Sequence, residues 1–294
     1  MATAAIPVDL FNPGQVFACL GFLEAADVLL GDAEGGFDWS DETSTTFELR
    51  ADSDRNPFEA VLEFLASATV FSLAPCGSEL KTDKWGIPTT TLNRATPFPF
   101  PEPRSPATLP ALLKDRNGSA LILDYWGDDP KQTNRDNVKF WAGSGGYPGA
   151  ALASDALNLV RGQMGGHHDN PFSLSSPQSS SFRLDWRRDY IPIDIGFSPN
   201  DHSNITMRGY PLVEILAAIG LTNARPQRVD RLTYRYGVIG VAVDQELFSP
   251  ALLRAALGTP KLPFPQRRFL MALGWPGQEN QARCIIDVTE ETNS

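Results

Sequence analysis

Residues 121–162, LILDYWGDDPKQTNRDNVKFWAGSGGYPGAALASDALNLVRG, contain both kinds of secondary structure that decide the fold. The apolar run Leu121–Leu123 predicts a buried strand, and from Ala150 onward apolar residues recur every three or four positions, which predicts a helix. A cation-bearing segment and the glycine-rich turn 143–146 lie between them. A strand, a basic loop and a helix N-terminus in this order can offer N–H groups and cations to a phosphate.

The glycine-rich turn does not carry a known nucleotide-binding fingerprint. Residues 143–146 read Gly-Ser-Gly-Gly, which is neither Gly-x-x-x-x-Gly-Lys-Ser/Thr nor Gly-x-Gly-x-x-Gly. Two interpretations of this segment therefore stay open, a structural turn and a loop that contacts nucleic acid.

Outward from this stretch, helical and strand-like segments mix without a strict βαβ alternation. Asn-Pro pairs at 12–13 and 56–57 predict helix starts, and Gly31 and Gly220 predict helix ends. We expect helices over about 13–30, 57–68, 211–220 and 251–257. We expect strands at 6–10, 45–49, 182–187, 231–236, 238–243 and 285–288, the fourth and fifth paired around Gly237. The pattern predicts a loop-rich α+β fold of mixed helices and largely antiparallel sheet.

The clearest break in composition is Met164–Ser181, which is rich in Gly, Ser and Pro. It predicts a flexible loop or linker. The chain then divides into an N-terminal α+β region, 1–163, and a C-terminal α+β region, 182–294, which can also pack as one domain.

The net charge of −10 is unevenly distributed. Residues 1–63 hold 13 acidic and 2 basic residues, a balance of −11, and the rest holds 22 acidic and 23 basic residues, a balance of +1. The acidic part repels phosphate and suits a basic partner protein, while the remainder can carry basic patches.

Other bulk features favour a cytoplasmic protein. No uninterrupted apolar run is long enough to span a bilayer, and the first residues lack the basic start of a secretory signal. Three widely spaced cysteines form neither a disulfide framework nor a metal knuckle.

Two groups of side chains suggest metal-dependent hydrolysis. His167-His168-Asp169 offers adjacent ligands, but it lies in the Gly/Ser-rich segment, and the only other histidine is His202. Asp124, Asp128 and Asp129 follow a predicted strand, but Gly127–Pro130 is equally typical of a tight turn. We expect no metal, no cofactor and no catalytic residue.

Four places combine a cation with an aromatic ring, a pairing that can hold a phosphate and stack on a base. They are Lys84-Trp85, Lys139-Phe140-Trp141, Trp186-Arg187-Arg188 and Tyr234-Arg235-Tyr236. The alternative is that the rings belong to the core and the cations lie beside them. The predicted nucleic-acid-binding residues are Lys81, Lys84, Arg135, Lys139, Trp141, Gly143, Ser144, Gly145, Arg187 and Arg188.

Several stretches together resemble a family found with type I-U (also called I-G) CRISPR interference modules. They are residues 12–15 (NPGQ) with 19–24 (CLGFLE), 139–143 (KFWAG), 182–187 (FRLDWR) with 196–200 (GFSPN), and 214–221 (EILAAIGL). Members are taken to be compact counterparts of the large subunit of the Cascade complex, and the resemblance extends from about residue 6 to about residue 260.

The resemblance implies assembly with a CRISPR backbone subunit and a repeat-processing subunit on a guide RNA. It also implies contact with target double-stranded DNA, including the short flanking motif and the strands separated in the R-loop. Cleavage would belong to a recruited nuclease-helicase. Three hypotheses follow: a non-enzymatic subunit of this antiviral complex, a metal-dependent nuclease or phosphohydrolase, and an adaptor that binds only proteins.

Overall fold

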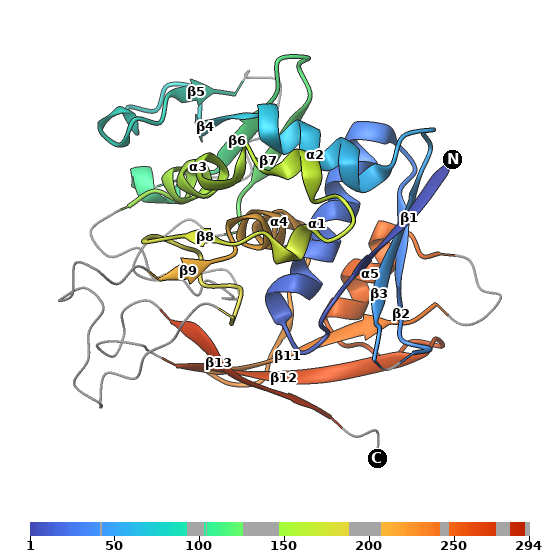
Figure 1. The fold of residues 1–294 in the computed structure, drawn as a ribbon. Coiled ribbons are helices and arrows are strands. Elements are labelled where there is room, and N and C mark those ends of the chain that lie inside the picture. The colour runs from blue at the N-terminus through green and yellow to red at the C-terminus, as the bar shows by residue number, and fades with distance from the viewer. Residues whose placement is uncertain are drawn as a thin grey trace.

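The computed structural model describes residues 1–41, 43–92, 103, 105–125, 147–187, 207–241, 247–274 and 283–291. Within these residues the predicted α+β fold is confirmed (Figure 1). The α-helices are α1 (Pro13–Leu30), α2 (Pro57–Ser67), α3 (Gly149–Val160), α4 (Pro211–Asn223) and α5 (Pro250–Leu257).

Four sheets are described, and nearly all of their strand pairs are antiparallel. The first has the order β1 (Ala2–Pro7), β3 (Thr46–Ala51), β2 (Glu34–Asp38). The second has the order β5 (Thr89–Thr91), β4 (Thr69–Ala74), β6 (Ala111–Lys114), β7 (Ala120–Leu123), with β5 parallel to β4. The third has the order β10 (Gln227–Arg228), β11 (Thr233–Ile239), β12 (Gln266–Gly274), β13 (Cys284–Glu290). The last pairs β8 (Ser176–Pro177) with β9 (Arg208–Gly209).

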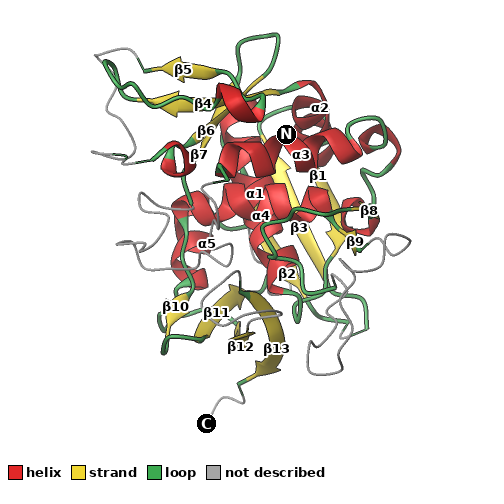
Figure 2. Ribbon diagram, turned by 90° about the vertical axis from the view of Figure 1, so that its left-hand side faces the viewer, coloured by secondary structure: helices red, strands yellow, loops and turns green. Residues whose placement is uncertain are grey.

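The centre of the molecule is the pair of helices α1 and α4. Figures 1 and 2 show them between the β5-β4-β6-β7 sheet above and the β10–β13 sheet below. Both are apolar almost all round, as expected of helices buried on every side. Among the described helices, α1 alone has the length and apolar composition of a membrane span, and 78% of it is buried inside the protein.

Two glycines let the backbones of α1 and α4 touch. A Cβ added at Gly21 of α1 would lie 2.6 Å from the carbonyl carbon of Leu216, and one at Gly220 of α4 would lie 2.8 Å from the amide nitrogen of Gly21. The prediction that Gly220 ends its helix is therefore wrong. α4 continues to Asn223, because Gly220 permits close helix packing and does not form a turn.

The other helix boundaries follow local signals. Gly31, at φ 83°, ends α1, and its N–H donates to the carbonyl of Asp27. The Asn56 side chain caps α2 by accepting from the N–H groups of Phe58 and Glu59, as its sequence predicts. Asn12 makes no such cap, because its side chain instead donates to the buried carboxylate of Asp185 at 3.0 Å.

The substitution Asn56→Ala is expected to lower the free energy of unfolding by about 1 kcal/mol, because two N–H groups of the first turn lose their acceptor. Asn56→Asp keeps an acceptor oxygen and serves as the matched control. Urea denaturation of the three proteins measures the difference. A loss in the aspartate variant as large as that in the alanine variant would contradict the capping role.

Two strand predictions are wrong. Residues 182–187 form no strand, because the Glu214 carboxylate accepts from the N–H groups of Leu184 and Asp185, and these are therefore not available to a β partner. Arg183 there has φ 60°, which no regular strand allows. Nor does Gly237 separate two paired strands: β11 runs straight through it, and its missing side chain makes room for the carbonyl of Ala256 in α5.

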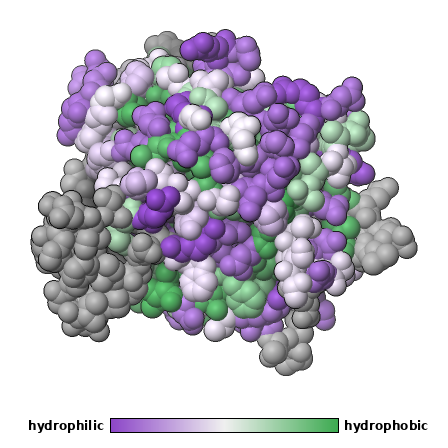
Figure 3. All heavy atoms as spheres, viewed as in Figure 1, coloured by the Kyte–Doolittle hydropathy of each residue, from purple (hydrophilic) through white to green (hydrophobic). Residues whose placement is uncertain are grey.

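The segment 164–181 holds two short 3₁₀ turns and β8, and it packs onto the rest of the protein. Met164, Phe172 and Leu174 are buried in the hydrophobic cluster that also takes residues from both α+β regions. Figure 3 shows that the face seen in Figure 1 is mostly hydrophilic, with small separate apolar patches.

Candidate nucleic-acid interface

The structure describes three of the ten predicted contact residues, Lys81, Lys84 and Arg187. Arg135, Lys139, Trp141, Gly143, Ser144, Gly145 and Arg188 lie outside the described residues, as do Asp128 and Asp129 of the alternative carboxylate group. For these positions the sequence-based hypotheses stay predictions.

Lys81 and Lys84 lie on an ordered turn between β4 and β5. The buried Thr82 fixes this turn, because its hydroxyl donates to the carbonyl of Ile87 and its N–H donates to the hydroxyl of Thr89. Gly86, at φ 72°, closes the short 3₁₀ helix Asp83–Trp85. Both lysines are exposed, and the Lys84 ammonium lies 3.9 Å from the centre of the Trp85 ring. A cation and a flat ring are thus held together on a fixed support.

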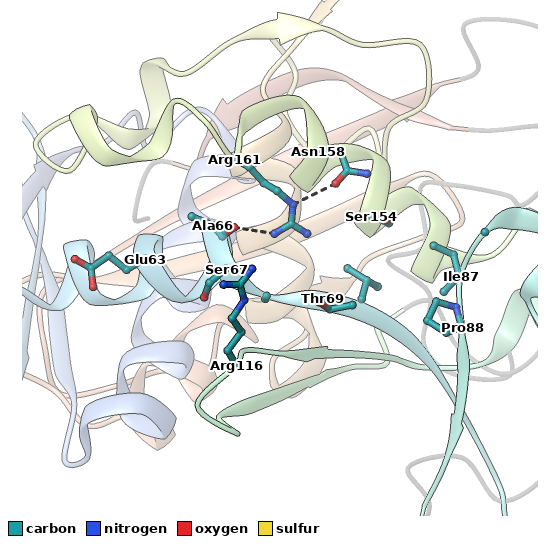
Figure 4. Close-up of a pocket in the computed structure, with 13 residues that line it drawn as sticks. Glu63, Ala66, Ser67, Thr69, Ile87, Pro88, Arg116, Ser154, Asn158 and Arg161 are labelled. Atoms are coloured by element: carbon teal, nitrogen blue, oxygen red, sulfur yellow. Dashed lines mark hydrogen bonds between the residues drawn. The ribbon is translucent and has the colours of Figure 1, made fainter.

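This turn borders a cleft of about 690 Å³. Its walls come from the end of α2, the start of β4, residues 86–88 of the turn, the β6–β7 connection and α3 (Figure 4). Two arginines line it: Arg116 from the β6–β7 connection and Arg161 from the residue after α3. Neither was among the predicted contact residues.

Arg161 is held in place by neutral partners. Its Nη1 donates to the carbonyls of Leu65 (3.3 Å) and Ala66 (2.9 Å), and its Nε donates to Oδ1 of Asn158 at 3.1 Å. The first two are terminal carbonyls of α2, where a positive charge is favourable. Burial lowers the pKa of Arg161, but a guanidinium stays protonated at neutral pH. The cleft therefore contains a fixed positive charge with no carboxylate bonded to it.

Arg116 stands on a tight hairpin turn. The Asp115 carboxylate accepts from the N–H groups of Asn117 (2.9 Å) and Ser119 (2.8 Å), and Gly118 adopts φ 94°. These contacts leave the Arg116 side chain exposed at the cleft.

Glu63 is the one acidic residue among those that line the cleft, and it forms an ion pair with Arg55. Figure 4 shows its carboxylate turned away from both arginines. The cleft is therefore positively charged.

The cations around this cleft differ from many others in the protein. Ion pairs join Arg50 to Glu34, Arg235 to Glu291, Arg254 to Glu24 and Arg267 to Glu290. In the part of the chain that the structure describes, Lys81, Lys84, Lys114, Arg116 and Arg161 make no ion pair, and we refer to these five as the basic edge. Their charge is available to an outside anion.

Arg187 has a different environment. It binds the Asp185 carboxylate through Nε and Nη2 (2.6 Å from Nη2 to Oδ2), and its guanidinium lies 3.5 Å from the centre of the Tyr210 ring. Because Asp185 compensates its charge, Arg187 is a weaker candidate for a phosphate contact.

The group Tyr234-Arg235-Tyr236 follows the alternative interpretation, in which the rings belong to the core and the cation lies beside them. Tyr234 and Tyr236 are fully buried, and Arg235 binds Glu291.

The alternative metal site has little support in its geometry. His168 Nε2 lies 3.4 Å from Asp169 Oδ1, and the Asp169 side chain is 92% exposed. Among the residues that the structure describes, no three His, Cys, Asp or Glu side chains come together in a way that could hold a metal ion. Asp124 is buried.

One of the two missed arginines had a usable sequence signal. Residues 115–118 read Asp-Arg-Asn-Gly between two apolar runs, which is typical of a hairpin turn and predicts an exposed Arg116. Arg161 had none, because its role depends on where the end of α2 lies in space.

Searches for similar proteins add nothing to this geometry, since no protein-family model, curated protein sequence or solved structure matches the chain.

Proposed function

We propose that this chain is a non-catalytic, nucleic-acid-binding subunit of a type I CRISPR surveillance complex in the cytoplasm. The observation that carries nucleic-acid binding is the basic edge, whose five cations make no ion pair among the described residues and two of which, Arg116 and Arg161, line a positively charged cleft. The sequence resemblance supports the rest: a type I-U complex with a backbone subunit, a repeat-processing subunit and guide RNA, which binds target DNA and leaves cleavage to a nuclease-helicase.

The physics of phosphate binding explains why unpaired cations matter. A cation already bound to a carboxylate must break that pair before it can bind a phosphate, whereas Lys84 and Arg116 need only lose water. Each phosphate contact releases condensed counterions, so binding weakens steeply as salt rises. Contacts of this kind position a strand without reading its sequence.

The double substitution Lys84→Glu/Arg116→Glu is expected to weaken DNA binding at least about tenfold and to flatten the plot of log K against log salt, by about 1.4 units for single strands. Binding of labelled DNA by the purified complex or full chain over a salt series measures both. The control is Lys261→Glu/Arg268→Glu, in and just before β12, which Figures 1 and 2 show on the other side of the helix pair from β4–β7.

If the complex that contains the Lys84/Arg116 variant keeps the affinity and slope of the unaltered complex, the basic edge makes no DNA contact there, and the adaptor that binds only proteins is favoured. Complex membership is tested separately, by identifying the proteins and RNA that co-purify with a tagged chain. Absence of guide RNA and of the backbone subunit would contradict it.

A further inference from the structure

The cleft beside the basic edge has two chemically different walls. One carries the Arg116 and Arg161 guanidiniums with the polar side chains of Ser67, Ser154 and Asn158. The other includes the apolar residues Ile87 and Pro88, which Figure 4 shows to the right of the two arginines. A volume of about 690 Å³ is within the range of pockets that enclose small organic ligands, about 300–1,000 Å³.

Arg161 has hydrogen-bonding capacity left over. Its Nε and Nη1 groups are occupied by Asn158 and by the two α2 carbonyls. Its Nη2 group makes no hydrogen bond within the described part of the protein, so two donors of an immobilised guanidinium remain open at the cleft. Arg116 is exposed on its hairpin turn and also lines the cleft, so its guanidinium can reach the same ligand. Two guanidiniums of this kind suit phosphate oxygens, which arginine binds with paired N–H groups.

We infer that this cleft binds one unpaired nucleotide, with its phosphate at Arg116 and Arg161 and its sugar and base against Ile87 and Pro88. The inference rests on the proposed function and specifies its ligand. A base in a duplex is stacked and paired, so a duplex can offer the cleft only its outer phosphates. An unpaired nucleotide can enter whole and bury its apolar faces. Arg161, fixed at the end of α2, binds the phosphate through its open Nη2 group, and Arg116 adds a second guanidinium from the hairpin turn.

The test compares three ligands on the full chain: a labelled single-stranded oligonucleotide, the same sequence as a duplex, and a mononucleotide as competitor. Arg116→Ala is expected to weaken single-strand binding about tenfold, the loss of one charge-assisted contact, and to change duplex binding much less. Lys114→Ala removes an exposed cation from the same hairpin but not from the cleft lining, so it is the matched control and should weaken both forms slightly and equally. Because Arg116 is exposed on a turn, its variant should keep the thermal midpoint of the unaltered protein.

The outcomes separate the inference from the proposed function. Displacement of the single strand by the mononucleotide shows that a free nucleotide occupies the cleft. If the mononucleotide does not displace the single strand, but Arg116→Ala still weakens single-strand binding more than duplex binding, the cleft binds a nucleotide only as part of a strand. Both results support the inference. An equal loss for single strand and duplex in Arg116→Ala overturns the inference but leaves nucleic-acid binding in place. Binding of the mononucleotide alone supports the inference and overturns the proposed function, and no binding of any ligand overturns both.

Discussion

Replacing Gly21 with alanine is expected to lower the free energy of unfolding by about 3 kcal/mol or more, because the new methyl group overpacks the contact between the two central helices. It would lie 2.6 Å from the carbonyl carbon of Leu216, closer than packed atoms can approach. The obstacle is backbone, which cannot rotate away as a side chain can. α1 and α4 must therefore separate, and this loosens contacts along both helices.

Gly220→Ala is expected to have a similar effect from the other side of the same contact, since its Cβ would lie 2.8 Å from the Gly21 nitrogen. One outward shift of α4 relieves both clashes, so the double variant should lose less stability than the sum of the two single variants. Full additivity would show that the two glycines act independently.

Urea denaturation with circular dichroism measures these changes. Gly165→Ala is the control, because a Cβ there meets no atom within 4 Å, and it should change stability by less than about 0.5 kcal/mol. An unchanged denaturation midpoint in Gly21→Ala would contradict the close packing of α1 on α4.

The second large effect is expected at the ion pair between α1 and α5. Glu24 is buried in α1 and accepts hydrogen bonds from Arg254 of α5 and, at 2.8 Å, from Asn223 at the end of α4. The Glu24 carboxylate raises the pKa of Arg254, which therefore carries its charge at any ordinary pH. One carboxylate thus joins three helices from distant parts of the sequence.

Arg254→Ala is expected to cost about 3 kcal/mol, because it leaves the Glu24 charge buried with a single amide partner. This value is at the low end for broken buried pairs, since the Arg254 side chain is 35% exposed. The double variant Glu24→Leu/Arg254→Leu removes both charges and should be more stable than Arg254→Ala. Thermal denaturation compares them. Arg55→Ala, which breaks the ion pair with Glu63 whose side chains are 56% and 60% exposed, is the control for loss of an exposed pair. A double variant as unstable as Arg254→Ala would exclude a buried unpaired charge as the cause.

Part of the candidate interface could be predicted from local sequence. The adjacent residues Lys84 and Trp85 already predict a cation beside an aromatic ring. The hairpin sequence Asp-Arg-Asn-Gly at 115–118 predicts that Arg116 is exposed. The cleft itself could not be predicted. Its fixed positive charge depends on the contact of Arg161 with the terminal carbonyls of α2, about one hundred residues earlier in the chain, and this contact has no trace in the sequence near either end.

The sequence by itself determined the elements whose causes are local. Helical periodicity with a starting Asn-Pro placed α1 and α2, and positive φ at Gly31 matched the end of α1. Only the tertiary structure decided the roles of Gly220, Gly237 and residues 182–187. The physical reason is that turn and helix preferences act over a few neighbouring residues. The space beside a glycine, or the partner of a backbone N–H, depends on which distant segment packs there.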